Sequence, residues 1–208
     1  MVGVMTWNNF QWRLRMLLFD CYQMLMGGVD KKISIFCNNC IGAFVAHDFR
    51  LPFNSPTVNL MIPPSEFIEY VANLKSFIGA SWEEVDSTQK WPIVLLGGKI
   101  HLNLIHYKNS FEGEVAWRRR EKRINFERMY FVLIETDGCT YEDLCRFDCL
   151  PYPHKIALTH KSYPDIKCSY VVKGYKDLGA VIDSYRFFKI LPFRKYDQFN
   201  WMKFLKQV

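Results

Sequence analysis

The sequence predicts a single α/β domain with a central mixed sheet flanked by helices. Short apolar runs alternate along the chain with longer segments of helical periodicity, which is typical of sheets covered by helices. Two strand-like runs are joined by Gly97-Gly98, and a two-glycine link between such runs indicates a β-hairpin with a primed turn. Half of the 208 residues are apolar, which is enough material for one core.

The N-terminal segment predicts an amphipathic helix. Apolar residues lie in it at helical spacing, namely Trp12, Leu14, Met16, Leu17, Leu18, Phe19 and Leu25. Arg13, Arg15 and Asp20 interrupt the segment, so it predicts neither a membrane span nor a cleavable signal peptide. The apolar arc is too wide for an isolated solvated helix. Two arrangements stay open: residues 1–28 pack on a domain formed by residues 29–208, or they lie on a membrane surface with Arg13 and Arg15 at the lipid headgroups.

The other elements follow from periodicity and from helix and turn signals. Strands are predicted at 32–37, 56–62, 92–96, 99–106, 129–135, 155–159 and 168–172. Helices are predicted from about Cys40 onward and at 64–77, 110–123, 141–147 and 198–206, with a surface loop at 79–90. In the strand at 99–106 the period of two places His106 on the apolar face and His101 on the other face.

Charge and cysteine content limit the class of protein. The formal net charge is +6, and no nucleic-acid-binding module is recognisable, so we expect no nucleic-acid partner. Seven cysteines, an odd number, without a signal peptide indicate reduced thiols and a cytoplasmic location. The basic cluster Arg118–Arg123 is interspersed with glutamates. It is either a solvated helix face with ion pairs or a site for phosphate or an anionic sugar.

Cys40 and His106 are candidates for a nucleophile and its base. Cys37 and Cys40 lack the second ligand pair that a structural zinc site needs, so we expect no metal and no cofactor. Cys40 lies at the predicted start of a helix, where a thiol pKa is lowered, and a strand-borne His106 would act as general base. His47 in the same helix is a rival base. Ordinary core roles are the more frequent case for such residues and are the alternative here.

A second candidate site is Glu135-Thr136-Asp137-Gly138, which follows a buried strand. α/β folds place ligand-binding groups at this end of a strand, and Asp137 would serve a metal-bridged sugar-nucleotide diphosphate. An ordinary Asp-Gly turn is the alternative. The sequence has no P-loop, no dinucleotide-binding glycine motif and no serine nucleophile elbow.

Several runs resemble, in order, a bacterial family of exopolysaccharide biosynthesis proteins of unknown function. They are CNNCIGAFVAHDF, IHLNLIHY, WRRREKRIN, ETDGCTYEDL and LPYPHKIALTHKSYP, and the resemblance spans residues 33–172. The matching motif residues are Asn38, Asn39, Cys40, Gly42, Ser55, Pro56, Thr57, His106, Tyr107, Arg119, Arg123, Asn125, Asp137 and Gly138. Gly42-Ala43 stands where the family is expected to have two glycines. More distantly, the order of Asn-Cys, His and a paired-arginine helix is similar to papain-like bacterial proteins.

Three functions from different classes follow. The resemblance implies a cytoplasmic protein of surface-polysaccharide assembly that transfers a sugar or an acyl group from an activated donor to a glycan. Its proposed catalytic residues are Cys40, His106 and Asp137, and its substrate-binding residues are Asn38, Asn39, Gly42, Arg118, Arg119, Arg123 and Asn125. The second function is a Cys-His hydrolase or acyltransferase with an oxyanion site at Asn39 or at backbone amides. The third is a binding module that organises a membrane-bound synthase at the inner face of the membrane.

Overall fold

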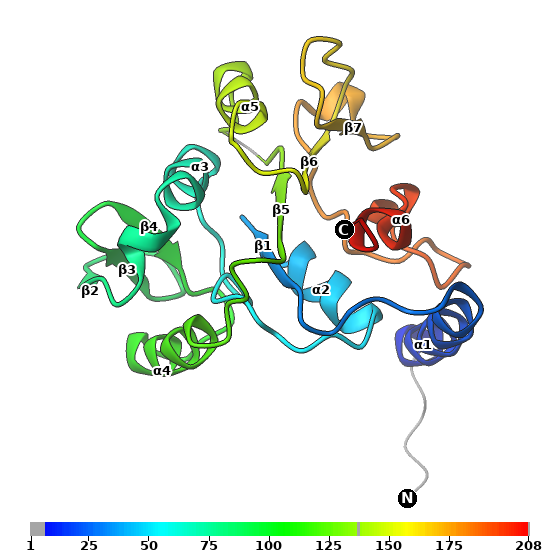
Figure 1. Cartoon of the computed structure of the whole chain (residues 1–208), viewed down its shortest axis with the longest axis horizontal. Helices are drawn as coiled ribbons and strands as arrows, with labels where there is room; N and C mark the ends of the chain where they lie inside the picture. The colour runs from blue at the N-terminus through cyan, green and yellow to red at the C-terminus, as the bar shows by residue number, and fades with distance from the viewer. Residues whose placement is uncertain (1–6, 137, 208) are drawn as a thin grey trace, which may run out of the picture.

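The computed structural model describes residues 7–136 and 138–207 (Figure 1). Within these residues the strands are β1 (Ser34–Cys37), β2 (Trp82–Val85), β3 (Ile93–Leu96), β4 (Ile100–Asn103), β5 (Met129–Ile134), β6 (Lys155–Thr159) and β7 (Ser169–Val171). The α-helices are α1 (Trp7–Met26), α2 (Ile41–Asp48), α3 (Pro64–Ala72), α4 (Ser110–Glu121), α5 (Tyr141–Asp148) and α6 (Trp201–Leu205). Short 3-10 helices lie at Leu74–Phe77, Lys176–Leu178 and Lys195–Gln198.

The strands confirm the α/β class and form two sheets. β1, β5, β6 and β7 make a parallel sheet in that order, and β2, β3 and β4 make a smaller antiparallel sheet. The predicted hairpin is present, because β3 pairs with β4 across Gly97-Gly98. Both glycines have positive φ, 59° and 67°, as a primed turn requires.

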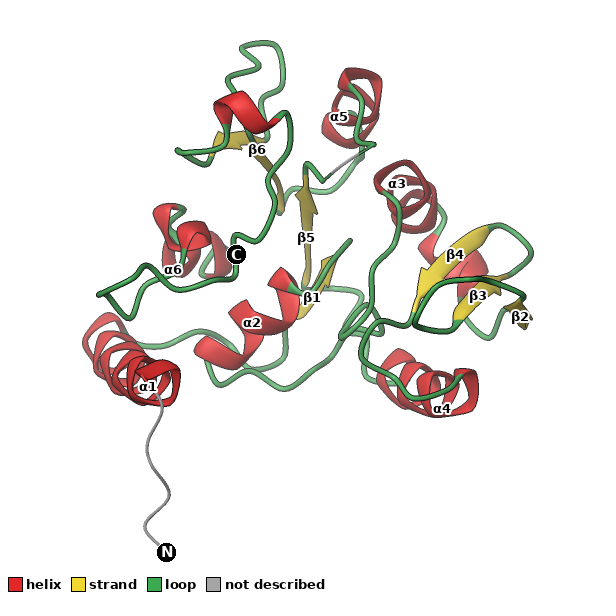
Figure 2. Ribbon diagram, turned by 180° about the vertical axis from the view of Figure 1, so that it is seen from behind, coloured by secondary structure: helices red, strands yellow, loops and turns green. Residues whose placement is uncertain are grey.

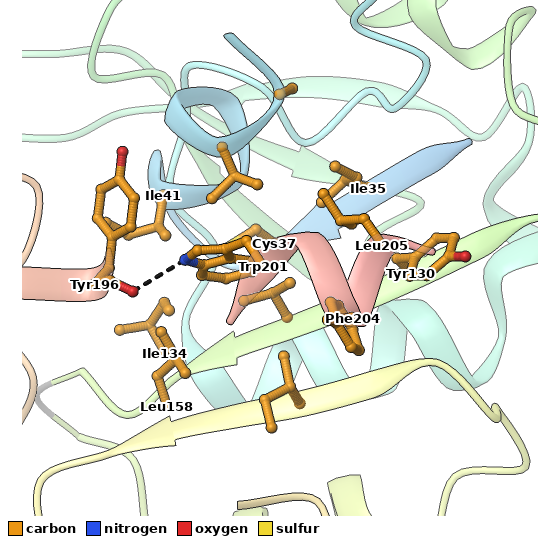
Figure 3. Packing of buried hydrophobic residues seen from close by; sticks show 14 of the residues in the cluster. Ile35, Cys37, Ile41, Tyr130, Ile134, Leu158, Tyr196, Trp201, Phe204 and Leu205 are labelled. Atoms are coloured by element: carbon orange, nitrogen blue, oxygen red, sulfur yellow. Dashed lines mark hydrogen bonds between the residues drawn. The ribbon is translucent and has the colours of Figure 1, made fainter. Parts of the chain in front are cut away.

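The parallel sheet is buried on both faces, which explains why its strands read as continuous apolar runs. Alternate residues enter two separate core clusters. Ile35 and Ile134 belong to the first and Phe36 and Leu133 to the second. Figure 3 shows Trp201 and other α6 residues packed over the face of the sheet that belongs to the first cluster. Figures 1 and 2 show α1, α2 and α6 on one side of β1 and β5, with α3, α4 and the small sheet on the other.

The two central strands are followed by helices on opposite faces. α2 comes after β1 and contributes Ile41 and Val45 to the first cluster. α5 comes after β5 and contributes Leu144 and Phe147 to the second cluster. Neighbouring parallel strands whose helices leave in opposite directions open a crevice at their carboxyl ends, where α/β proteins bind ligands. The fold therefore has its topological switch point between β1 and β5.

Gly42 permits close packing of α2 on β1. A Cβ atom at this position would lie 2.6 Å from the Cβ of Cys37, a contact that real side chains do not make. The Cβ atom of Cys37 is bonded directly to the backbone of β1, so rotation of the side chain cannot move it away. The first turn of α2 therefore requires glycine for a packing reason.

α1 is anchored on the α/β body by a buried arginine. Arg15 is 0% exposed and donates to Asp48 from Nε at 3.0 Å and Nη2 at 2.6 Å. Its Nη1 and Nη2 also donate to Asp197 at 2.5 and 2.7 Å. Burial alone would lower the pKa of Arg15, but the hydrogen bonds to both carboxylates outweigh this effect and raise it. Of the two arrangements left open for this helix, the one with Arg15 at lipid headgroups does not fit the structure, because its guanidinium points into the protein.

Three local predictions were also wrong. Residues 56–62 form no strand apart from one bridge between Met61 and Asn103, because Asn59 adopts a positive φ of 65° that breaks the extended run. The predicted loop at 79–90 contains β2, whose Trp82 donates to Ser110. β4 ends at Asn103, so His106 lies in an exposed turn and not on the apolar face of a strand.

Two predicted helices have different bounds in the structure. The helix predicted at 64–77 is α3 followed by a 3-10 helix, and the closing helix at 198–206 is the shorter α6. None of the helices in the described ranges has the length and hydropathy needed to span a membrane.

We predict that Arg15→Met destabilises the protein by about 3–5 kcal/mol, because it leaves the buried Asp48 and the partly buried Asp197 without their cation. Urea unfolding followed by tryptophan fluorescence measures this change. Arg13→Met, at an exposed position of the same helix, is the matched control and is expected to stay within about 0.5 kcal/mol of the parent. Equal effects of the two substitutions would contradict a structural role for Arg15.

We predict that Gly42→Ala lowers the free energy of unfolding by about 1–3 kcal/mol through overpacking. Gly113→Ala is the comparison, because its new Cβ would lie 2.7 Å from the end of the Leu104 side chain, which can rotate away. Gly42→Ala should therefore be the more destabilising change in thermal melts. The reverse order would show that β1 and α2 separate easily.

Candidate functional site

A pocket of about 440 Å³ lies at the switch point between β1 and β5. Its volume is in the range of small-molecule sites. Five chain segments form its wall, with the lining residues Asn39, Cys40, Ile41, Phe44, Met61, Ile105, His106, Thr136, Val181, Ile182, Asp183, Ser184 and Tyr185. Cys40 and His106, far apart in the sequence, thus face the same cavity.

The two asparagines after β1 have different tasks. Asn38 is buried and joins the ends of the two central strands: its Nδ2 donates to the Ile134 carbonyl at 3.0 Å, and its Oδ1 accepts from the Ile134 amide at 2.8 Å. Both ends of its amide are therefore occupied, and Asn38 is not among the lining residues. Asn39 does line the pocket. Its Oδ1 accepts from the Ile41 amide at 2.9 Å, while its Nδ2 makes no hydrogen bond within the described structure.

Cys40 occupies the N-cap position of α2, as predicted, but its thiol is not activated there. Burial raises the pKa of Cys40 to about 11. The expected lowering by the helix N-terminus is overridden, because desolvation disfavours the thiolate. His106 lies exposed at the pocket, and no hydrogen bond joins it to Cys40 among the described residues. His47, the rival base, packs against Trp12 of α1 with ring centroids 5.6 Å apart and the rings tilted by 43°, and it does not line the pocket.

Residues 181–185 form a wall that sequence reasoning missed. The Val181 amide donates to the Glu135 carbonyl at 2.7 Å, which ties this segment to the end of β5. The ring of Tyr185 stacks on Phe44 of α2 at 5.7 Å. Asp183 has a positive φ of 47°, an uncommon conformation for a residue other than glycine. No motif marks this segment, since its place in the pocket depends on contacts with β5 and α2.

The predicted basic residues lie elsewhere. Asn125 donates from its backbone amide to Ser34 Oγ at the start of β1, so this region is at the amino end of the sheet, opposite the pocket. Arg118 donates to the Ala80 carbonyl at 2.6 Å, and Arg119 and Arg123 are exposed at or near the end of α4. None of these arginines lines the pocket that contains Cys40.

The remaining predicted site residues are Gly42 and Asp137. Gly42 serves the packing of α2 and does not line the pocket. Asp137 lies outside the described residues. Among the residues that are described, no three His, Cys, Asp or Glu side chains lie close enough to hold a metal ion.

A buried Glu135–His160–Tyr163 cluster lies next to the pocket. Glu135 accepts from the His160 backbone amide at 2.7 Å and from the Tyr163 hydroxyl at 2.6 Å. The ring Nδ1 of His160 lies 2.8 Å from Glu135 Oε2, the oxygen that accepts from the His160 backbone amide. The two atoms are not aligned for a hydrogen bond. Burial and the Glu135 carboxylate raise the pKa of Tyr163. One feature of the sequence could have predicted this cluster. Glu135 directly follows β5 and His160 directly follows β6, so both residues lie at the carboxyl edge of the parallel sheet.

We predict that Cys40 reacts slowly with iodoacetamide near neutral pH. With a pKa of about 11, its thiolate fraction should rise about tenfold for each pH unit up to that value. Mass spectrometry of the alkylated protein measures each thiol, and the exposed Cys21 is the internal control. Faster labelling of Cys40 than of Cys21 at pH 7 would contradict the raised pKa.

Comparison with known proteins gives the family. The model of the family described as "Domain of unknown function (DUF1919)" matches residues 23–206. The chain is also similar to an uncharacterised protein of Haemophilus influenzae, with 31% identity over 174 residues that cover 84% of each chain. The matched span contains both sheets and every wall of the pocket. This chain therefore belongs to the DUF1919 family.

Proposed function

We propose that this protein is a transferase of surface-polysaccharide assembly, which moves a sugar or an acyl group from an activated donor to a hydroxyl of a glycan. The observation that carries the proposal is that Cys40 and His106 line one cavity at the switch point of the sheet. The order of the motifs around these residues resembles exopolysaccharide biosynthesis proteins, and this resemblance supports the same class.

The lining of the pocket favours a neutral part of the substrate. Its walls are mainly apolar and include the rings of Phe44 and Tyr185. Within the described residues the lining holds no lysine or arginine, and its one carboxylate, Asp183, is paired with Arg186. Rings of this kind provide an apolar body against which a sugar or an acyl chain can pack. Asn39 and Ser184 add polar atoms that can fix the orientation of such a group.

In the proposed reaction His106 acts as general base. Its imidazole takes the proton of the acceptor hydroxyl while the hydroxyl oxygen forms a bond to the donor carbon. The bond from that carbon to the leaving group breaks, and the electron pair departs with the leaving group. A positioned base of this type contributes about 10²–10⁴-fold to a rate.

Cys40 fits this reaction as an uncharged wall residue. Its pKa of about 11 leaves roughly one thiol in 10⁴ ionised at pH 7. A Cys-His hydrolase or acyltransferase remains the second candidate, because the two residues share the pocket. That mechanism would need His106 to take the Cys40 proton as substrate binds.

A ligand screen tests the proposal. Nucleotide sugars and acyl thioesters are added at millimolar concentration, and the melting temperature of the full chain is measured. A donor present at 100 times its Kd stabilises the folded state by about 2.7 kcal/mol, which raises Tm by roughly 5–10 °C in a chain of this size. Absence of any shift across both donor classes would overturn the proposal.

Two substitutions separate the candidate mechanisms once a donor is found. We predict that His106→Ala lowers kcat by about 10²-fold or more, whereas Cys40→Ser changes it only a few-fold. His101→Ala is the control. This half-exposed histidine of β4 pairs with Glu66 of α3 and is absent from the pocket. Loss of activity in Cys40→Ser equal to that in His106→Ala would favour the cysteine nucleophile.

A further inference from the structure

The outer face of α1 carries a continuous apolar stripe. Gln11, Arg15 and Met16 point into the protein and are buried. The opposite face presents residues at the repeating spacing of one helix side, namely Phe10, Leu14, Leu17, Leu18, Cys21, Met24 and Leu25. Leu25 is 79% exposed. A solvated helix would carry polar residues on this side, so the stripe marks a surface for another apolar phase.

A second apolar segment lies beside this stripe. Gln11 Nε2 donates to the carbonyls of Phe188 and Leu191 at 2.9 and 3.1 Å, and Arg15 Nη1 donates to the Pro192 carbonyl at 3.1 Å. These bonds hold residues 185–193 along α1, at the outer edge of the molecule in Figure 2. The segment exposes Tyr185, Phe188, Ile190, Leu191 and Phe193, and Ile190 is 79% exposed.

A groove connects the two segments. It has a volume of about 510 Å³, and its lining includes Leu18 and Tyr22 of α1 and Phe193 of the adjacent segment. We call the stripe, the groove and residues 185–193 together the apolar platform. Because the platform is wider than a single helix, it suits an extended apolar phase better than one docked helix.

Charge around the platform favours an anionic surface. Residues 185–195 hold no carboxylate, although Arg194 is buried there and Arg186 is paired with Asp183. Asp197, which lines the groove, is paired with Arg15, so the carboxylates named here beside the platform each have an arginine partner. The exposed Arg13 lies on α1, and the one carboxylate of that helix, Asp20, is paired with Arg50. A second copy of the chain would bring like charges together across a symmetric interface. Anionic lipid headgroups attract the same cations.

We infer that the apolar platform docks on the surface of a bilayer that contains anionic lipids, and that the glycan acceptor is lipid-linked. Ile182 and Tyr185 are exposed and also line the candidate pocket, so a docked protein would hold the pocket close to the membrane. There the sugar of a lipid-linked glycan could enter the pocket while its lipid stays in the bilayer. The assignment of the acceptor depends on the proposed transferase function, whereas the docking does not.

Vesicle sedimentation of the full chain tests the docking. Wild-type protein should sediment with vesicles of phosphatidylcholine and phosphatidylglycerol, and less with phosphatidylcholine alone. The double substitution Leu17→Ser and Leu25→Ser removes two exposed leucines from the stripe and should weaken partitioning about tenfold or more. Ile190→Ser should weaken it through the neighbouring segment. Phe111→Ser is the matched control, since Phe111 of α4 is 75% exposed outside the platform.

The outcomes distinguish a bilayer from a second copy of the chain as the occupant of the platform. They also distinguish failure of the docking from failure of the proposed transferase function. No sedimentation of the wild type, or equal loss in Phe111→Ser, would overturn the docking. A dimer in light scattering that disappears in the double variant, without vesicle binding, would assign the platform to a second copy. Transfer to a soluble glycan without vesicle binding would overturn this inference alone. Vesicle binding that persists in His106→Ala, with no transfer by the wild type, would overturn only the proposed function.

Discussion

The buried guanidinium of Arg15 joins three segments that are distant in the chain. Asp48 ends α2, Asp197 belongs to the C-terminal segment, and Arg15 is in the middle of α1. An arginine with no exposed surface is stable only if its charge and its donors are matched, and the two carboxylates provide this match. The network sets which side of α1 faces the protein. It also holds Pro192 and Asp197 beside α1, and residues 181–185 of the pocket wall lie just before these residues in the chain.

The position of the pocket follows from the directions of two helices. α2 and α5 leave neighbouring strands toward opposite faces, so no helix covers the carboxyl ends between β1 and β5. Asn38 fills the inner part of this gap and satisfies both backbone groups of Ile134. The space outside Asn38 is then closed by the turn at His106 and by residues 181–185. Of the two adjacent asparagines, Asn38 thus joins the strand ends and Asn39 lines the pocket.

Burial governs the chemistry available at Cys40. A helix N-terminus and a low-dielectric surrounding act on a thiol in opposite directions, and here burial raises the pKa to about 11. In the proposed function, this neutral thiol forms part of the pocket wall beside rings and aliphatic side chains. The proposed reaction therefore assigns the proton transfer to His106, which lines the same pocket.

The local features of this fold were determined by the sequence itself. Helical periodicity, the Gly97-Gly98 turn and the helix start at Cys40 depend on neighbours within a few residues, so they could be predicted. Only the tertiary structure decided that Arg15 is buried, that residues 56–62 form no strand and that His106 shares a cavity with Cys40. It also separated the arginines of α4 from that cavity. These outcomes depend on contacts between residues far apart in the chain, which no local pattern encodes.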